Sequence, residues 1–276
     1  MSFPEIPAFY RTLAIPTSFG AAKSTVYYPP AGWNSTPAVH VNFHGGGFVI
    51  GHPEQDEPLC RYLAARTPAA VLNVDYLLAP QHPFPAAPQQ AWEVVQWVAE
   101  HGAENGWDAS RITVGGQSAG GALAAAAARQ ARTIGTPALG LQILHYPALD
   151  AATSSWAKRS TVSRPVIRPW LCEILIGAYL PHPEDRTDPL ASPADGTNAD
   201  GLSGIAPAVV ITCEQDLLRD EGIVYARKLR DVGALAEHCD LPRTDHAYNI
   251  FGHDTTLAAH VYDLMANHLR RAHTGR

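Results

Sequence analysis

The sequence predicts an α/β fold in which a mostly parallel β-sheet is covered by helices on both faces. Short runs of β-branched or other apolar residues recur along the chain, and stretches with the apolar spacing of amphipathic helices lie between them. The apolar runs are nearly continuous, which is typical of strands that are buried on both faces. The 276 residues contain no internal repeat and no low-complexity tract, so residues 1–276 are interpreted as one domain.

The expected strands and helices alternate in chain order. Strands are predicted at TVYYP, AVHVNF, AVLNVDY, RITVGG, LGLQILHYP and AVVITC, which are residues 25–29, 38–43, 70–76, 111–116, 139–147 and 208–213, with a further short strand around 236–241. Helices are predicted at 54–67, 86–101, 119–132, 219–232 and 255–272. A strand followed by a helix and then another strand is the connection that parallel sheets require.

One long segment interrupts this alternation between Pro147 and Ala208. It is rich in Pro, Asp, Ser and Ala and contains one plausible helix at 167–180. A connection of this length inside a compact domain is usually functional, often a lid, although a solvated surface insertion is the alternative. Its large apolar residues favour a packed cap over residues 151–200: Trp156, Trp170, Leu171, Ile174 and Leu175.

Composition excludes several classes of partner. The formal net charge is −6 and no long basic run is present, so a nucleic acid or an anionic membrane surface is not expected to bind. The four cysteines are widely spaced without a CxxC pair, which argues against a zinc site or a disulfide framework and fits a reducing compartment. The N-terminus lacks a signal-peptide pattern, and no stretch is long and apolar enough to span a bilayer. We therefore expect a cytoplasmic protein without membrane insertion.

The sequence GQSAG at residues 116–120 predicts a catalytic nucleophile, Ser118. It ends a predicted strand and opens an alanine-rich helix, which is the strand–turn–helix context of a nucleophile elbow. The turn is sharp, so small residues are needed on both sides of the serine. The following helix directs free amides and the positive end of its dipole towards developing negative charge. The alternative is a glycine-rich turn with a capping serine.

A serine hydroxyl needs a base, and the base needs an orienting acid. The acid is predicted to be Asp216 in CEQDLLRDEG, because it lies just past the end of a strand, where the loop turns towards the site. Glu214 and Asp220 are the neighbouring alternatives. Glu214 is close enough to belong to the strand, and Asp220 is expected in the first turn of the next helix.

The base is predicted to be His246, which lies between a short strand and the last helix. His238 falls within that strand, and His253 is the weaker competitor because it lies closer to the final helix. The chain order of serine, acid and histidine, each on a loop after a later strand, is the order of the α/β-hydrolase arrangement.

The run HGGGF at residues 44–48 predicts an oxyanion hole. Acyl transfer develops negative charge on the substrate oxygen, and preformed backbone donors stabilise that charge by a few kcal/mol. Glycine leaves amides uncovered, so Gly46 and Gly47 are expected to donate two hydrogen bonds and Ala119 a third. A phosphate-binding loop is excluded as the alternative because neither a following Lys-Ser/Thr pair nor a GxGxxG pattern is present.

Together these motifs resemble the hormone-sensitive-lipase family of α/β-hydrolases, in particular its bacterial carboxylesterases. The resemblance covers the chain from about residue 25 to its end and is carried, in family order, by HGGGF (44–48), VDYLLAPQHPFPAA (74–87), GGQSAGG (115–121), DPLASP (188–193), DLLRDEG (216–222) and the His246 loop. It implies an eight-stranded, mostly parallel sheet with a cap, no metal or organic cofactor, and hydrolysis of esters with short to medium acyl chains.

The resemblance also implies roles for individual residues. Ser118 is the nucleophile, His246 the base, Asp216 the orienting acid, and His44 orders the glycine loop. The oxyanion hole is expected from Gly46, Gly47 and Ala119. A homodimer is possible by analogy with the family alone.

Several positions depart from the family pattern. Members more often have Asp at Gln117, Arg at Leu77 and Glu at Gln81, which suggests a supporting charge network that is exchanged here as a set. The His246 loop reads His-Ala-Tyr where His-Gly-Phe is usual. The N-terminus is also shorter than in members, whose first helices form half of the cap. We therefore expect a more open site, with 151–200 as the main lid.

The resulting expectation is a serine carboxylesterase that acts on a small-molecule ester through an acyl-enzyme. An amidase or arylformamidase uses the same machinery and remains open from the motifs. A non-catalytic small-molecule receptor is the alternative from another class, and the intact serine, acid and histidine set argues against it. A lipase for long-chain triglycerides is not expected, because no apolar surface helix suited to an oil interface is evident.

Overall fold

The computed structural model describes residues 6–33, 36–195, 201–252 and 254–274, and an eight-stranded sheet forms its centre. The spatial order is β1-β2-β4-β3-β5-β6-β7-β8. β1 pairs with β2 and β2 with β4 in antiparallel orientation, and the other neighbours are parallel. The strands are β1 Tyr10–Thr17, β2 Gly20–Tyr27, β3 Ala38–Phe43, β4 Ala69–Asp75, β5 Ile112–Gln117, β6 Leu139–His145, β7 Ala208–Cys213 and β8 Leu235–Leu241. The predicted fold class, a mostly parallel α/β sheet, is confirmed.

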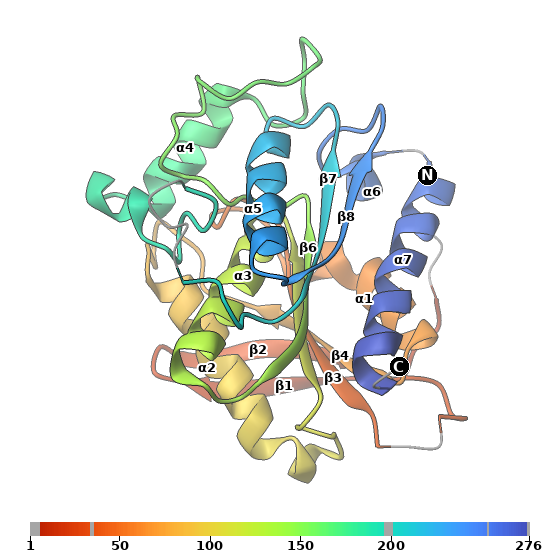
Figure 1. Cartoon of the computed structure of the whole chain (residues 1–276). Helices are drawn as coiled ribbons and strands as arrows, with labels where there is room; N and C mark the ends of the chain where they lie inside the picture. Colours follow the sequence, from red (N-terminus) through yellow and green to blue (C-terminus); the bar gives the residue numbers. More distant parts are fainter. Residues whose placement is uncertain (1–5, 34–35, 196–200, 253, 275–276) are drawn as a thin grey trace.

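Helices cover both faces of this sheet (Figure 1). One apolar cluster packs α2, α3 and α5 against the sheet, and a second packs α1 and α7 against the other face. The helices are α1 Glu57–Arg66, α2 Ala86–His101, α3 Ala119–Ile134, α4 Pro169–Tyr179, α5 Arg219–Asp231, α6 Tyr248–Phe251 and α7 Thr255–Thr274, with short 3-10 turns η1 Pro53–Asp56, η2 Ala103–Asn105 and η3 Pro183–Thr187. Every predicted helix is present, with ends that differ by a few residues.

The first strand of the sheet was not anticipated. β1 pairs with β2 from Tyr10↔Tyr27 to Thr17↔Gly20, so a two-residue hairpin joins them. Pro16 lies in β1, and proline lacks the amide that a central strand needs. β1 is the edge strand, where one side of the ladder is open and proline is tolerated. The prolines near the N-terminus made this strand hard to predict, although they are compatible with it.

The described N-terminal residues lie away from α4. Ile6 and Ala8 pack against the cluster formed with α1 and α7. Figure 1 shows α4 at one end of the sheet, on the side of α5 and away from α7. Ile6 and Ala8 therefore pack on the other side of the sheet from α5, and residues 6–9 do not line the cavity beside Ser118.

The sheet gathers the predicted site residues at one edge. The glycine loop follows β3, Ser118 follows β5, Asp216 follows β7 and His246 follows β8. The carboxyl ends of parallel strands meet at the same edge, where ligands of open α/β sheets bind. Across the described ranges, no helix has the length and apolar character that crossing a membrane requires.

Candidate active site

Ser118 occupies a strained turn between β5 and α3. Its backbone angles are φ 56° and ψ −118°. A Cβ atom on Gly116 would lie 2.4 Å from the carbonyl carbon of Gly120, and one on Gly120 would lie 1.9 Å from the carbonyl oxygen of Phe43. Larger residues therefore cannot flank the serine in this backbone, as expected for a nucleophile elbow.

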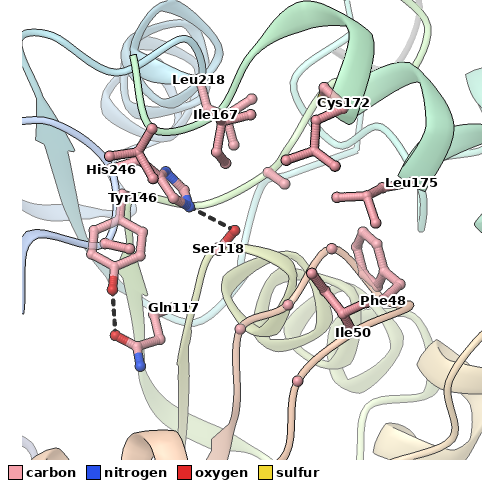
Figure 2. A pocket seen from close by; sticks show the side chains of 18 of the residues that line it. Phe48, Ile50, Gln117, Ser118, Tyr146, Ile167, Cys172, Leu175, Leu218 and His246 are labelled. Carbon is pink, nitrogen blue, oxygen red and sulfur yellow. Dashed lines mark hydrogen bonds between the residues drawn. The ribbon is translucent and has the colours of Figure 1, made fainter. Parts of the chain in front are cut away.

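Ser118, His246 and Asp216 form one chain of hydrogen bonds. His246 Nε2 lies 2.9 Å from Ser118 Oγ, and His246 Nδ1 lies 2.6 Å from Asp216 Oδ2 (Figure 2). The other Asp216 oxygen accepts a 3.0 Å hydrogen bond from the amide of Leu218. All three side chains are buried. A base held between a hydroxyl and a carboxylate is the arrangement that activates a serine nucleophile.

The alternative acids and bases lie elsewhere. Glu214 accepts a hydrogen bond from the amide of Arg243, and Asp220 is exposed on α5. His238 lies within β8 and pairs with Thr212. His253 lies outside the described residues. Asp216 and His246 are thus the described candidates that meet Ser118.

The glycine loop lies against the nucleophile. A Cβ atom on Gly45 would lie 3.6 Å from Cβ of Ser118. Gly46 has φ +120° and Gly47 φ +60°, which side chains rarely adopt, and a Cβ atom on Gly46 would lie 1.5 Å from the carbonyl oxygen of Ile50. Ala119 begins α3, where the first amides have no acceptor within the helix. Gly46 and Gly47 line the same cavity as Ser118, and Ala119 directly follows the serine. The role of the three amides stays a prediction.

His44 orders this loop without reaching the reacting atoms. Its Nδ1 lies 2.7 Å from the carbonyl oxygen of Gly45, and its ring stacks on Tyr76 at 4.3 Å. Tyr76 donates its hydroxyl to the carbonyl oxygen of His44. Burial lowers the pKa of His44 to about 4, so the ring is neutral near pH 7 and donates from Nδ1.

An apolar cavity of about 630 Å³ opens beside Ser118. Figure 2 shows Ile167, Cys172 and Leu175 on its cap side, and Phe48 and Ile50 on the glycine-loop side. Apolar walls with a few placed polar groups are the usual form of a small-molecule site. This cavity suits a substrate whose reacting carbonyl carries a hydrocarbon chain.

A segment before α4 joins the two loops that carry Asp216 and His246. We call residues 158–166 the strap. Ser160 donates to the carbonyl oxygen of Gln215, and the amide of Val166 donates to Asp245, the residue before His246. These contacts fix the strap across the carboxyl ends of β7 and β8.

A buried ion pair anchors the start of the strap, and sequence reasoning missed it. Lys158 Nζ lies 2.5 Å from Glu221 Oε2 on α5, and it also donates to the carbonyl oxygen of Asp150. Burial opposes the charged ammonium, but the Glu221 carboxylate outweighs burial and raises the pKa of Lys158. Glu221 lies in the DLLRDEG motif, but Lys158 lies in a polar stretch that gave no sequence signal.

Gln117 does not pair with the positions that sequence reasoning grouped with it. Its hydrogen bonds go to Asp56, Tyr146 and Asn249. Gln81 is exposed on the surface. In this chain the charged partner of Gln117 is Asp56 in η1. The exchange of positions 77, 81 and 117 as one set stays a prediction.

Metal ligands and disulfides are not part of the described site. Within the part of the chain that the structure describes, no group of three or more His, Cys, Asp or Glu side chains could hold a metal ion. All four cysteines are free.

Comparisons with known proteins show the family of this chain. A family model described as alpha/beta hydrolase fold matches residues 40–250. The chain belongs to this family, and it is a serine hydrolase. It is similar to the carboxylesterase NlhH of Mycobacterium tuberculosis, with 37% identity over 249 residues that cover 90% of this chain and 77% of the relative. It is also similar to an ethyl acetate hydrolase of Pseudomonas putida, with 34% identity over 76% of this chain and 65% of the relative.

Solved structures of esterases superpose on the whole chain. EstE1, a thermostable carboxylesterase cloned from a metagenomic library, matches with a TM-score of 0.90 and 33% identity, covering 98% of this chain and 92% of EstE1. An esterase from the archaeon Pyrobaculum calidifontis matches with a TM-score of 0.88 and 34% identity over 96% of this chain and 84% of that one.

Proposed function

We propose that the protein is a carboxylesterase of the hormone-sensitive-lipase group, and that it hydrolyses esters with short to medium acyl chains. The observation that carries the proposal is the hydrogen-bonded chain of Ser118, His246 and Asp216, with contacts of 2.9 and 2.6 Å, at the wall of an apolar cavity. The names of the similar proteins, which are esterases and carboxylesterases, support an ester rather than another acyl compound.

The proposed reaction has two acyl-transfer steps. Ser118 Oγ attacks the ester carbonyl carbon while its proton passes to Nε2 of His246. The imidazolium then gives this proton to the leaving alkoxide, so the alcohol departs and the acyl group stays on Ser118. Water attacks the acyl-enzyme by the same route and releases the acid. Asp216 holds the Nδ1–H tautomer of the histidine and stabilises the imidazolium.

The reaction also develops negative charge on the carbonyl oxygen, and this charge has to be stabilised. The amides of Gly46, Gly47 and Ala119 are proposed to donate to that oxygen. Removing one such donor from a serine hydrolase costs about 3 kcal/mol of transition-state stabilisation. Two observations support this role: Gly46 and Gly47 line the same cavity as Ser118, and both have positive φ angles that favour glycine.

We propose that residues 151–200 act as the cap of this site, of which 151–195 are described. α4 carries Leu171, Cys172 and Leu175 into the cavity wall. With no described N-terminal residue in that wall, the chain length of the acyl group is expected to depend on α4 and on the glycine loop.

Hydrolysis of p-nitrophenyl esters from acetate to decanoate tests the function. The wild type is expected to turn over short chains best, and Ser118→Ala is expected to lower kcat by about 10⁴-fold or more with its melting temperature retained. Activity that survives the substitution would contradict the assignment of the nucleophile. A folded wild type that cleaves matched p-nitroanilides but not the esters would point to an amidase.

Oligomeric state and location stay predictions. A homodimer is expected by analogy, and sedimentation equilibrium at micromolar concentration measures it. The widely spaced free cysteines support a reducing, cytoplasmic compartment.

A further inference from the structure

A buried polar network lies directly beneath Ser118, with Gln117 at its centre. The Gln117 amide nitrogen donates to Asp56 Oδ1. Its carbonyl oxygen accepts hydrogen bonds from the hydroxyl of Tyr146 at 2.5 Å and from Nδ2 of Asn249 at 2.9 Å. Figure 2 shows Gln117 and Tyr146 pointing towards each other below the serine. Gln117 and Asp56 are both fully buried.

Each partner of Gln117 either contacts or belongs to a segment that carries part of the proposed machinery. Asp56 also accepts from the amide of Gly45, so it joins the glycine loop to the elbow. The ring of Tyr146 lies 4.6 Å from the ring of His246, and Asn249 lies in α6, three residues after that histidine. The network therefore connects the oxyanion loop, the nucleophile turn and the histidine loop.

The hydrogen bonds of the network fit one carboxylate, that of Asp56, and one side-chain amide, that of Gln117. The other charged oxygen of Asp56 accepts from Asn42 at 3.0 Å, and Gln55 donates to the carboxylate as well. These partners are neutral donors, and no ion pair of Asp56 occurs among the described residues. Glutamine is suited to its position because it presents a donor to the carboxylate and an acceptor to Tyr146 and Asn249.

Burial disfavours the charged form of the Asp56 carboxylate, whereas the surrounding hydrogen-bond donors favour it. Burial raises the pKa of Asp56 to about 6, although its hydrogen bonds oppose the rise. The group is therefore mainly charged at neutral pH, and a second carboxylate beside it would be strongly disfavoured.

We propose that the Asp56–Gln117 pair is a positioning unit that holds the glycine loop and the His246 loop in register with Ser118. This inference rests on the proposed serine hydrolase mechanism. Asp56 does not line the cavity, so it acts on the reaction only through the groups that it holds. A misplacement of about 1 Å in reacting or stabilising groups costs on the order of 10²-fold in rate. Loss of the pair therefore lowers kcat and leaves KM nearly unchanged.

An exchange of the two functional groups tests the unit. Gln117→Glu places two carboxylates side by side, and kcat is expected to fall about 10²-fold or more, with KM within about threefold. Asp56→Asn removes the anion and is expected to lower kcat about 10-fold. The double variant Asp56→Asn/Gln117→Glu restores one amide facing one carboxylate, and the introduced carboxylate can still accept from Tyr146 and Asn249. Its kcat is expected to exceed that of Gln117→Glu by at least about 10-fold.

The matched control is Gln89→Glu, which makes the same charge change at an exposed position of α2. It is expected to retain the wild-type kcat. If Gln117→Glu does not fold, Asp56→Asn and the double variant carry the test, since both lack the doubled carboxylate. A wild-type kcat in Asp56→Asn would overturn the proposal. A double variant that is no faster than Gln117→Glu would also overturn it.

A second readout separates this inference from the choice of substrate. A fluorophosphonate phosphonylates an activated serine irrespective of the natural ester: Ser118 Oγ displaces fluoride from phosphorus while its proton passes to His246. The rate of this reaction depends on the same loops. The variants are expected to follow the same order in this rate as in kcat. A wild type that does not cleave esters but still reacts with the probe would refute the ester assignment alone. Equal labelling rates in all variants would refute the positioning unit.

Discussion

Glycine residues shape the candidate site at the scale of single residues. At positions 46, 116 and 120 backbone atoms of other residues occupy the space that a side chain would need. Ala247, the residue after His246, also has a positive φ angle of 53°. This left-handed conformation costs an alanine more than the glycine that is usual in the resembling family.

Gly120→Ala is expected to destabilise the fold by about 3 kcal/mol or more, as overpacking against rigid backbone does. Its Cβ atom would lie 1.9 Å from the carbonyl oxygen of Phe43, and neither backbone segment can move freely. Gly140→Ala is the control, since its Cβ atom would have no neighbour closer than 3.7 Å. Urea unfolding measures both variants, and equal midpoints would show that the elbow has more room than its geometry indicates.

Asp216→Asn is expected to lower kcat by about 10⁴-fold, because the asparagine side chain cannot fix the Nδ1–H tautomer of His246 as the carboxylate does. Steady-state hydrolysis of p-nitrophenyl acetate measures the effect. Asp220→Asn makes the same change four residues away on the exposed side of α5 and is expected to have little effect. A large loss in Asp220→Asn with activity kept in Asp216→Asn would reverse the assignment of the acid.

At the scale of elements, the strap joins the segment before α4 to the two loops that carry Asp216 and His246. Its anchor, Lys158 with Glu221, is almost completely shielded from water, with side-chain exposures of 9% and 3%. A second pair, Arg219 with Asp240, is about 30% exposed. Pairs in these two environments contribute differently, because burial removes the water that would otherwise solvate a charge left alone.

Lys158→Met is expected to destabilise the protein by about 3–5 kcal/mol, since it leaves Glu221 buried without its cation. The double variant Lys158→Met/Glu221→Gln removes both charges and is expected to recover a large part of that loss. Arg219→Met, at the more exposed pair, is expected to cost about 1 kcal/mol or less. Urea unfolding of the three variants provides the comparison. A double variant less stable than Lys158→Met would contradict the role of the unpaired charge.

At the scale of the whole molecule, several histidines are buried in the neutral state. Burial lowers the pKa of His40 to about 3, of His44 to about 4 and of His273 to about 4, and it holds that of His145 well below its usual value. In the unfolded chain a histidine takes up a proton near pH 6.5. Unfolding below that pH therefore takes up protons.

The free energy of unfolding is expected to fall as the pH decreases from about 6.5 to 4. Burial raises the pKa of Asp56 to about 6, so this carboxyl acts in the opposite direction. The four histidines outweigh it, and a net uptake of about three protons corresponds to about 4 kcal/mol per pH unit. Urea unfolding at pH 7, 6 and 5 measures the slope. His273→Gln is expected to reduce the number of protons taken up on unfolding by about one, which makes the slope shallower. A stability that rises towards pH 5 would contradict this account.

The fold class and the three candidate catalytic residues followed from local sequence patterns. Apolar runs and helical spacing predicted the parallel part of the sheet, because strands buried on both faces need continuous apolar residues. The positions of Ser118, Asp216 and His246 after successive strands predicted that they would meet, because parallel strands end at one edge. The structure brings these three residues together. β1 escaped prediction because Pro16 is tolerated only by virtue of its place at the sheet edge, which is a tertiary property.

Sequence by itself thus determined the fold class and the three candidate catalytic residues. Tertiary structure alone decided the partners of Gln117, the ion pair between Lys158 and Glu221, and the course of the strap. The physical reason is range. Helix and strand patterns repeat over neighbouring residues, whereas a buried polar group is satisfied by whichever donor or acceptor the packing brings to it, here from segments 61 and 63 positions apart.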